Sequence, residues 1–235
     1  MTCRVKRPCF LTILGGARSP DRRTFAWFPL VGAGIGAVMA AVWWGAQLLW
    51  PPGVAAAILV AVDLGFTGLL HIDGLADCAD GLLPHTDRDR RLEVMRQPDV
   101  GAFALAVVPV VLLARWAALA TGQIQPLSLV GIWATSRIII ATVPSLVPYA
   151  RDSGVATAFI AGARRSFAGW LIPAAAIIVM GEGAVGIAAA FTALAAAAGI
   201  VVLVGRRIGG FTGDVLGASV VLSETAALLT LAVKP

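Results

Sequence analysis

The sequence predicts an all-α fold: a polytopic membrane helix bundle of about seven spanning helices, in a single domain over residues 1–235. The composition is the first observation behind this prediction. Of the 235 residues, 59% are hydrophobic and 13% are charged, and the mean hydropathy is +0.88. Soluble domains carry roughly 25% charged residues. In lipid the backbone must satisfy its own hydrogen bonds, so long apolar segments form helices.

The second observation is that seven apolar segments have about the length of a membrane span, which needs roughly 20 residues. They lie at residues 25–49, 54–70, 101–120, 127–147, 167–180, 184–204 and 215–232. The fifth segment is short and contains Pro173. Gly181-Glu-Gly183 separates it from the sixth segment as a turn.

The third observation is that basic and uncharged loops alternate. All Lys and Arg before Lys234, except Arg115 and Arg137, fall in the N-terminal tail and in loops 71–100, 149–166 and 205–213. The intervening loops, at 50–53, 121–126 and 181–183, contain none. Basic loops stay in the cytoplasm. We therefore expect a multi-pass inner-membrane protein with a cytoplasmic N-terminus, residues 1–24 being a basic cytoplasmic tail.

The net charge of +5 has the same origin. Basic residues in short loops favour contact with anionic lipid, so we expect the bilayer and no nucleic acid as a partner. The three cysteines, Cys3, Cys9 and Cys78, are irregularly spaced. Their number and spacing argue against a disulfide framework and against a zinc site.

Four ionisable residues fall inside the expected spans: Asp63, Arg115, Arg137 and Glu224. Charged side chains are costly in a bilayer and usually face protein or a wet cavity. Arg115 lies near the outer end of its segment, so we expect its side chain to snorkel to the membrane surface. For Arg137, which follows Ser136, pairing with an acid and contact with a substrate both remain open.

The stretch His71-Ile-Asp73-Gly-Leu-Ala-Asp77-Cys-Ala-Asp80 directly follows the second expected span. Aspartates at i, i+4 and i+7 share one face of a helix, where like charges repel each other. A divalent cation removes this repulsion, and carboxylate-only ligands select Mg²⁺ or Mn²⁺ over zinc. The sequence therefore predicts a cytoplasmic metal site formed by Asp73, Asp77 and Asp80. A solvated acidic helix face is the alternative.

Residues 71–100 as a whole are expected to form a cytoplasmic catalytic loop and helix. His71 would point away from the acids, so substrate contact, proton transfer and a satisfied interfacial histidine are alternatives for it. Leu92 and Met95 are i, i+3 neighbours, which indicates an amphipathic helix that Pro98 ends. The basic residues of this helix either clamp phosphate or contact lipid headgroups.

A glycine-rich stretch, Gly209-Gly-Phe-Thr212-Gly-Asp214, precedes the last expected span. Thr212 is a candidate cap for that helix. Glycines allow backbone amides to approach an anion, and Asp214 would complete a metal or nucleotide site. A second glycine-rich stretch, residues 32–36, lies inside an apolar span without a preceding strand. We interpret it as close helix packing and not as a dinucleotide-binding loop.

Taken together, these stretches resemble the cobalamin synthase family. The acidic stretch matches the family's His-x-Asp-Gly-x-x-Asp-x-x-Asp-Gly signature. Residues 91–101, 136–137, 149–151 and 210–218 are similar to further family elements in the same order. Two positions depart from the family. Residues 12–15 read Thr-Ile-Leu-Gly where Thr-x-Leu-Pro is usual, and Val221 stands where the first of two glutamates is usual, Glu224 being the second.

The resemblance implies that adenosylcobinamide-GDP and α-ribazole, or α-ribazole 5′-phosphate, are joined to give adenosylcobalamin, or its 5′-phosphate, and GMP. This is a metal-dependent phosphoryl transfer late in cobalamin biosynthesis. It implies Asp73, Asp77 and Asp80 as catalytic residues and metal ligands. The candidate substrate contacts are His71, Arg91, Arg96, Arg137, Arg151 and Asp214.

Other functions stay open at this point. A CDP-alcohol phosphotransferase also uses an aspartate-rich membrane helix, but its pattern has Arg where Asp77 stands. A transporter would use Asp63, Arg115, Arg137 and Glu224 as a charged pathway. A noncatalytic scaffold for corrinoid-pathway enzymes would tolerate loss of the aspartates. Association into homo-oligomers or with other enzymes of that pathway is also open.

Overall fold

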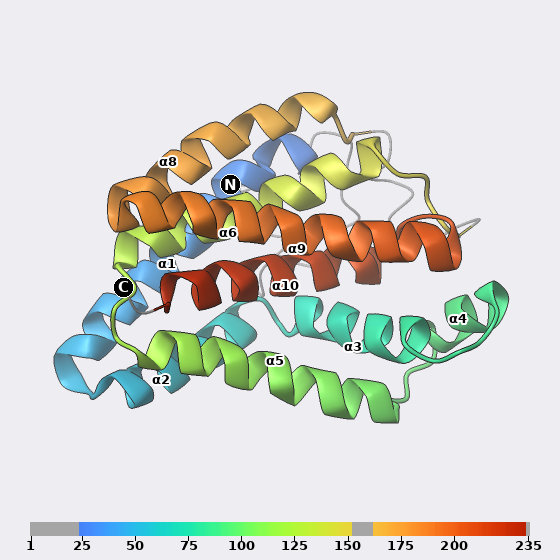
Figure 1. Ribbon diagram of the computed structural model, residues 1–235, viewed down its shortest axis with the longest axis horizontal. Coiled ribbons are helices and arrows are strands. Elements are labelled where there is room, and N and C mark those ends of the chain that lie inside the picture. The colour runs from blue at the N-terminus through green and yellow to red at the C-terminus, as the bar shows by residue number, and fades with distance from the viewer. Residues whose placement is uncertain (1–23, 152–161, 234–235) are drawn as a thin grey trace, which may run out of the picture.

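The computed structural model describes residues 24–151 and 162–233, which form a bundle of helices (Figure 1). Within these ranges, extended pairing is limited to one parallel bridge, between Tyr149 and Phe211. The all-α fold class predicted from the composition is confirmed.

Some sequence-based predictions fall outside the described residues. The expected basic tail, residues 1–24, lies outside them except for its last residue. Cys3 and Cys9 belong to that tail, and residues 152–161 belong to the basic loop at 149–166. Cys78 is described, and it is a buried free thiol.

The helices follow one another with short connections. In chain order they are α1 (Phe28–Leu49), α2 (Pro52–Phe66), α3 (Leu70–Leu82), α4 (Arg88–Val94), α5 (Ala102–Ala120), α6 (Pro126–Thr142), α8 (Leu171–Glu182), α9 (Ala184–Ile208) and α10 (Gly213–Leu231). Short 3-10 helices adjoin three of them, namely η2 (Thr24–Trp27) before α1, η3 (Val143–Ser145) after α6 and η4 (Arg165–Trp170) before α8.

Helices α6 and α10, which are largely buried, form the centre of the bundle. α6 packs against α1 and α8, and α10 packs against α9, α3 and α6. α5 runs beside α3 on the outer side (Figure 1). α5 and α9 bury little of their surface and expose large apolar side chains. An apolar outer surface of this kind suits a bundle that faces lipid.

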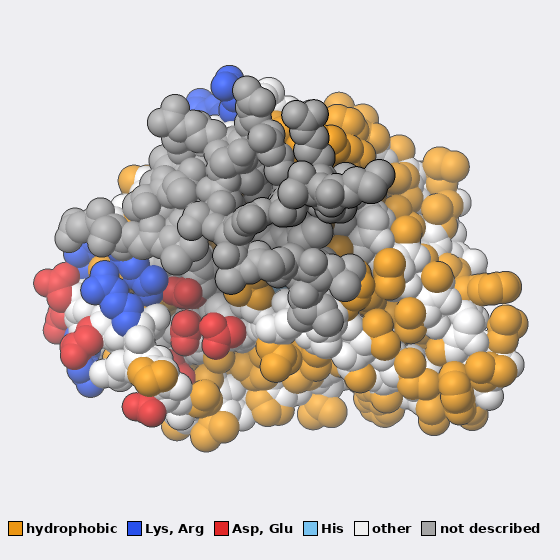
Figure 2. Space-filling model, turned by 180° about the vertical axis from the view of Figure 1, so that it is seen from behind, with side chains coloured by type: hydrophobic (Ala, Val, Ile, Leu, Met, Phe, Trp, Pro, Cys, Tyr) orange, Lys and Arg blue, Asp and Glu red, His pale blue; other side chains and the backbone are white. Residues whose placement is uncertain are grey.

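The connecting loops gather at two ends of the bundle, as their alternating charge predicts. At one end the Arg88 Nε donates to the backbone oxygen of Ile208 (3.1 Å), which joins two basic loops. At the other end the backbone N–H of Gln125 donates to the Glu182 carboxylate (2.8 Å), which joins two loops without Lys or Arg. Figure 2 shows charged side chains concentrated at one end of the molecule and hydrophobic side chains covering the other.

Five helical segments in the described ranges are long and apolar enough to cross a membrane, and six qualify if α2 and α3 count as one span bent by 89°. α8 has 12 residues, or about 18 Å at 1.5 Å per residue. The hydrocarbon core is about 30 Å thick. The expected count of seven spanning helices is therefore not confirmed, because α8 alone is too short and α2 is broken from α3.

A sharp turn between α2 and α3 ends the second expected span early, at Phe66. Gly68 and Leu69 both have left-handed backbone angles, with φ of 61° and 60°. Gly68 adopts such an angle without a Cβ clash. The turn sets α3 at 89° to α2, so that α3 runs toward the charged end of the bundle.

The glycines of α1 allow close packing on α6, as predicted. A Cβ added to Gly32 would lie 2.6 Å from the backbone oxygen of Trp133, and one added to Gly36 would lie 2.6 Å from the Cα of Val130. Gly34 has no such neighbour within 4 Å. Small residues at positions facing another helix let two backbones approach closely in membranes.

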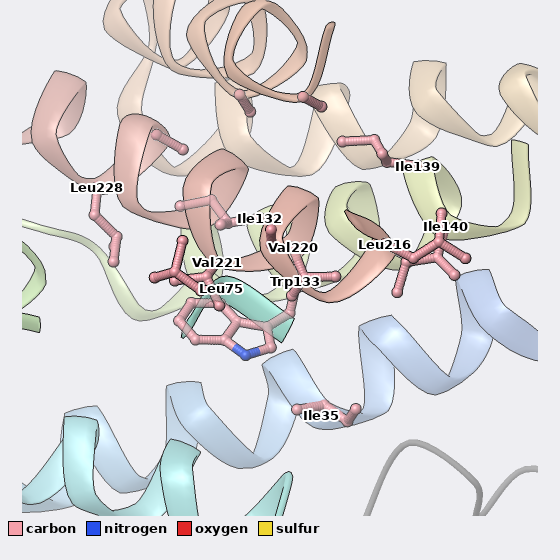
Figure 3. Packing of buried hydrophobic residues seen from close by; sticks show 14 of the residues in the cluster. Ile35, Leu75, Ile132, Trp133, Ile139, Ile140, Leu216, Val220, Val221 and Leu228 are labelled. Atoms are coloured by element: carbon pink, nitrogen blue, oxygen red, sulfur yellow. The ribbon is translucent and has the colours of Figure 1, made fainter. Parts of the chain in front are cut away.

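The apolar side of α3 packs into the buried core. Figure 3 shows Trp133 of α6 among Leu75 of α3 and Val220 and Val221 of α10. All four side chains are buried. This packing fixes the rotation of α3 about its axis and so determines which way its aspartates face.

Candidate active site

Two aspartates of α3 have free carboxylates in a cavity at the charged end of the bundle. The cavity has a volume of about 230 Å³ and is lined by α3 and by the segment that follows α4. Asp73 is exposed and Asp77 is half-buried. Neither carboxylate has a hydrogen bond or ion pair with any residue that the structure describes.

Asp80 also lines this cavity, but backbone amides hold its carboxylate. Its two oxygens accept the N–H groups of Gly101 (2.7 Å) and Ala104 (3.0 Å). These amides belong to the start of α5, where helices have unpaired donors. A Cβ on Gly101 would lie 2.5 Å from the Asp80 carboxylate, so a larger residue there would displace this carboxylate. Asp80 therefore joins α3 to α5.

A close helix contact places Asp214 beside the acidic face of α3. A Cβ on Gly74 would lie 2.6 Å from the backbone oxygen of Asp214. One turn along α10, a Cβ on Gly217 would lie 3.4 Å from the backbone of His71. The Asp214 carboxylate accepts a hydrogen bond from Arg151 Nη2 (2.9 Å), and the two residues form an ion pair. Asp214 is thus a paired carboxylate, unlike Asp73.

The glycine-rich loop before α10 holds the segment that carries Arg151. The Ala150 N–H donates to the backbone oxygen of Phe211 (2.9 Å) across the parallel bridge. Thr212 caps α10, as predicted, by accepting the N–H of Val215 at 3.4 Å. The loop therefore holds the neighbours of both Arg151 and Asp214, through the Phe211 backbone on one side and the Thr212 side chain on the other.

The segment that follows the short helix α4 forms one wall of the cavity. Asp87 caps the helix by accepting the N–H of Arg90 (2.9 Å), and this hydrogen bond lowers the pKa of the Asp87 carboxyl. Leu92 and Met95 are buried, as their spacing predicts. The helix ends before Pro98, which lines the cavity.

A second hollow, a groove of about 470 Å³, adjoins the cavity. Residues 96–98 line both hollows and separate them. Arg88 lines the groove and is anchored through the backbone oxygens of Ile208 (3.1 Å) and Ala150 (2.9 Å). Arg96 is exposed and has no hydrogen bond or ion pair within the described ranges. The free guanidinium of Arg96 thus stands between the acidic cavity and the groove.

Arg91, another expected substrate contact, faces the interior. Its Nη1 donates to the backbone oxygens of Gly81 (3.0 Å) and Leu82 (2.8 Å). Arg207 of α9 donates to the same Leu82 oxygen. Both arginines therefore satisfy carbonyl groups at the C-terminal end of α3, where helices leave acceptors unpaired. Arg91 lines neither the cavity nor the groove.

His71 and Arg137 also lie away from the cavity. His71 is buried, and its Nε2 has no hydrogen-bond partner among the described residues. Arg137 is fully buried and pairs with Glu224 of α10. Of the two alternatives for Arg137, the structure shows the ion pair. Six expected substrate contacts thus divide evenly. Arg96, Arg151 and Asp214 lie at the site, and the others lie in the interior.

Arg115 is part of the same buried network, so the expectation that it snorkels to the membrane surface was wrong. Its Nη2 donates to Asp63 (3.0 Å) and to Glu224 (3.0 Å), and its side chain is 4% exposed. Its guanidinium also lies over the Trp133 ring, 5.6 Å from the centroid. Asp63 and Glu224 lie within reach of Arg115 inside the bundle, so its charge is paired there. Glu224 also pairs with Arg137.

This network explains the departure at Val221. Glu224 serves the buried arginines and does not line the acidic cavity. Val221 lies in the apolar cluster beside Trp133 (Figure 3). A valine at this position therefore removes no carboxylate from the cavity.

The cavity suits a hard divalent cation with fewer protein ligands than the sequence predicts. In the described part of the chain, no group of three or more His, Cys, Asp or Glu side chains is arranged to hold a metal ion. Asp73 and Asp77 have free oxygens, whereas Asp80 is engaged by two amides. Mg²⁺ is often held by one or two carboxylates, with water and substrate phosphates completing its shell. Metal binding at Asp73 and Asp77 stays a prediction.

Several residues that sequence reasoning did not single out also line the groove, among them Arg88 and Gln97. Arg88 stands four residues before the buried Leu92, so both lie on one side of α4. That spacing is a signal that places Arg88 beside the neighbouring loops, although its side chain is 53% exposed. Gln97 lies after the helix, and its position depends on how the chain turns there.

Comparison with known proteins agrees with these features. A family model for cobalamin-5-phosphate synthase matches residues 9–232. An adenosylcobinamide-GDP ribazoletransferase of Prosthecochloris aestuarii is 33% identical over 91% of this chain and 89% of its own length. Enzymes of the same name from Leptothrix cholodnii and Ectopseudomonas mendocina are 37% and 34% identical, over 86% and 93% of this chain and 81% and 92% of their own lengths. No solved structure matches the chain. The chain belongs to the cobalamin-5-phosphate synthase family.

Proposed function

We propose that this protein is an adenosylcobinamide-GDP ribazoletransferase. It joins adenosylcobinamide-GDP to α-ribazole, or to α-ribazole 5′-phosphate, and releases GMP together with adenosylcobalamin, or its 5′-phosphate. One observation carries the proposal beyond family membership. An acidic cavity with two free carboxylates opens beside a groove with arginines, at the charged end of a membrane helix bundle.

The reaction exchanges one bond at phosphorus for another. A ribose hydroxyl of α-ribazole attacks the phosphorus bonded to cobinamide, and the bond from that phosphorus to the GMP oxygen breaks. The hydroxyl loses its proton, for which a free carboxylate of the cavity is an acceptor. Phosphoryl transfer depends mainly on positioning and on stabilising charge. The rigid contacts around Asp80 and Asp214 supply the positioning.

Asp73 and Asp77 are the residues that would hold Mg²⁺ or Mn²⁺, which when bound would neutralise the diphosphate and the leaving phosphate. Without a counter-charge, two free carboxylates would repel that diphosphate. Arg96 and Arg151 add positive charge on the groove side of the cavity.

We also place this site on the cytoplasmic side of the inner membrane. The support is the charge of the loops around it, because loops rich in Lys and Arg stay in the cytoplasm. The nucleotide-activated substrate is a soluble anion, and it would reach a cavity on that side without crossing lipid.

Turnover by purified membranes tests the proposal. The membranes are incubated with adenosylcobinamide-GDP, α-ribazole and Mg²⁺, and GMP and cobalamin are measured. Asp77→Asn should lower turnover at least 100-fold, a loss of about 2.7 kcal/mol in transition-state stabilisation at 1.36 kcal/mol per tenfold. The variant should remain folded, because Asp77 has no protein partner in the described chain.

Glu182→Gln is the matched control, since this acid lies at the opposite end of the bundle and Gln keeps an oxygen that can accept from Gln125. It should retain wild-type turnover. Normal turnover by Asp77→Asn would overturn the site, and a wild-type protein that releases no GMP would overturn the activity.

A further inference from the structure

The groove of about 470 Å³ has the dimensions of a binding site for one small ligand. Its volume falls within the roughly 300–1,000 Å³ typical of pockets for drug-sized molecules. A nucleotide fits such a volume, whereas a corrin ring with its side chains is much larger. The groove therefore suits one of the nucleotide-like parts of the reaction and not the corrinoid.

The groove is connected with the reaction centre through a shared wall. Residues 96–98 line the groove on one side and the acidic cavity on the other. A ligand in the groove can thus extend a phosphate to Arg96 at the edge of the cavity. Arg88 and Arg151 are held in place by backbone oxygens or by Asp214. Arg96 has its donors available, because no described residue pairs with it.

Two acidic residues that line the groove distinguish between the nucleotide-like parts of the reaction, which are the guanosine monophosphate half of adenosylcobinamide-GDP and α-ribazole. Asp89 and Glu93 line the groove but not the cavity. Each uses one carboxylate oxygen in an ion pair, with Arg88 and Arg90 respectively. The second oxygen of each carboxylate has no partner within the described ranges.

Guanine presents a ring N–H and an amino group as adjacent donors, which match free carboxylate oxygens. The dimethylbenzimidazole base of α-ribazole has no N–H donor and two methyl groups, so it offers these carboxylates no hydrogen bond. A polar groove lined by carboxylates and by an arginine with free donors matches a guanosine monophosphate.

We infer that the groove binds the guanosine monophosphate half of adenosylcobinamide-GDP, with Arg96 on its phosphate and Asp89 and Glu93 on the guanine. This inference rests on the proposed function, because that function supplies the guanylylated substrate. It adds a nucleotide subsite and places the attacking α-ribazole on another side of the cavity.

Direct binding of GMP tests the subsite without requiring turnover. The purified protein in lipid nanodiscs is titrated with GMP, and the dissociation constant is compared with that of Arg96→Gln. Loss of a charge-assisted contact with phosphate should weaken GMP binding roughly tenfold. The KM for unphosphorylated α-ribazole should stay within about twofold. The fold of Arg96→Gln is checked by thermal unfolding, which should match wild type.

Arg206→Gln is the matched control, because Arg206 is an exposed arginine in the last turn of α9, at the same charged end, and lines neither hollow. It should bind GMP as wild type does. Glu93→Gln should reduce the preference for GMP over AMP, because the amide replaces a guanine acceptor with a group that also donates.

Equal GMP affinity in Arg96→Gln and wild type would overturn the subsite. If that variant also lost affinity for α-ribazole 5′-phosphate, the groove would be assigned to the other substrate. A wild-type protein that binds GMP through Arg96 but makes no cobalamin would instead overturn the proposed function and leave the nucleotide subsite standing.

Discussion

Asp77 and Asp80 stand three residues apart on α3, yet their carboxylates have different partners. Asp80 accepts two backbone amides at the start of α5, while Asp77 faces the cavity without a partner among the described residues. The first arrangement stabilises the fold, and the second leaves oxygens available for chemistry. The same residue type in one motif therefore serves two purposes.

Substitutions of Asp80 test this division. Asp80→Ala should lower the stability by roughly 1–3 kcal/mol, because it leaves two partly buried amides without their acceptor. Asp80→Asn should lose less, since its side-chain oxygen can still accept one amide. Thermal unfolding in detergent micelles measures both. We also expect Asp80→Asn to turn over faster than Asp77→Asn. Equal stability of Asp80→Ala and wild type would contradict the capping role.

At the scale of the helix, glycines determine how closely the elements approach. The contact between α3 and α10 depends on Gly74 and Gly217, and the contact between α1 and α6 depends on Gly32 and Gly36. The first of these contacts brings Asp214 to the acidic face of α3. A motif glycine between two aspartates therefore has a packing reason at a distance from the chemistry.

Gly74→Ala should separate α3 from α10, because its Cβ would lie 2.6 Å from a backbone oxygen that cannot move by itself. Overpacking of this kind costs typically 1–3 kcal/mol, and we expect turnover to fall as Asp214 shifts away. Gly34→Ala is the control, since nothing lies within 4 Å of its added Cβ. It should leave turnover and thermal unfolding near wild type. Similar losses in both variants would disprove the packing explanation.

At the scale of the whole molecule, a buried charge network joins four helices. Asp63 of α2, Arg115 of α5, Arg137 of α6 and Glu224 of α10 form a set in which two positive and two negative charges balance. Neutral pairing is what allows such residues to lie inside a membrane bundle. The network fixes how the helices around α3 are arranged. None of its four residues lines the cavity.

Glu224→Gln should be the most destabilising single change in this network, because it leaves Arg137 buried without its acid. Breaking a buried pair costs roughly 3–5 kcal/mol. The double variant Asp63→Leu with Arg115→Met should cost less than the sum of the two single changes, since it removes opposite charges together. Thermal unfolding of the wild type, the two single variants and the double variant measures the coupling between Asp63 and Arg115. Strictly additive losses of stability would speak against a connected network.

Orientation in the membrane is also a property of the whole molecule. In a variant without Cys3, Cys9 and Cys78, a cysteine replacing exposed Gln123 should react with a membrane-impermeant maleimide on intact cells. A cysteine replacing exposed Arg90 should react only after the membrane is opened. The opposite labelling pattern would place the cavity on the outer side and reject a cytoplasmic active site.

Much of the fold and part of the site could be predicted from local patterns. Helix periodicity located α3 and the buried side of α4, and loop charge predicted which loops meet at each end. The separation of Arg91 from Arg96 could not be predicted, because both are basic residues of one short segment. Arg91 turns inward to the carbonyl groups that end α3, and only the packing of α4 on α3 provides those acceptors.

The sequence by itself determined the membrane bundle, the family and the acidic face of α3, because composition and residue spacing are properties of the chain alone. Only the tertiary structure decided which charged residues remain free at the site. Asp80, Arg91, Arg115 and Arg137 each find partners on another helix. The physical reason is that a side chain is available for binding only when folding brings no partner to it.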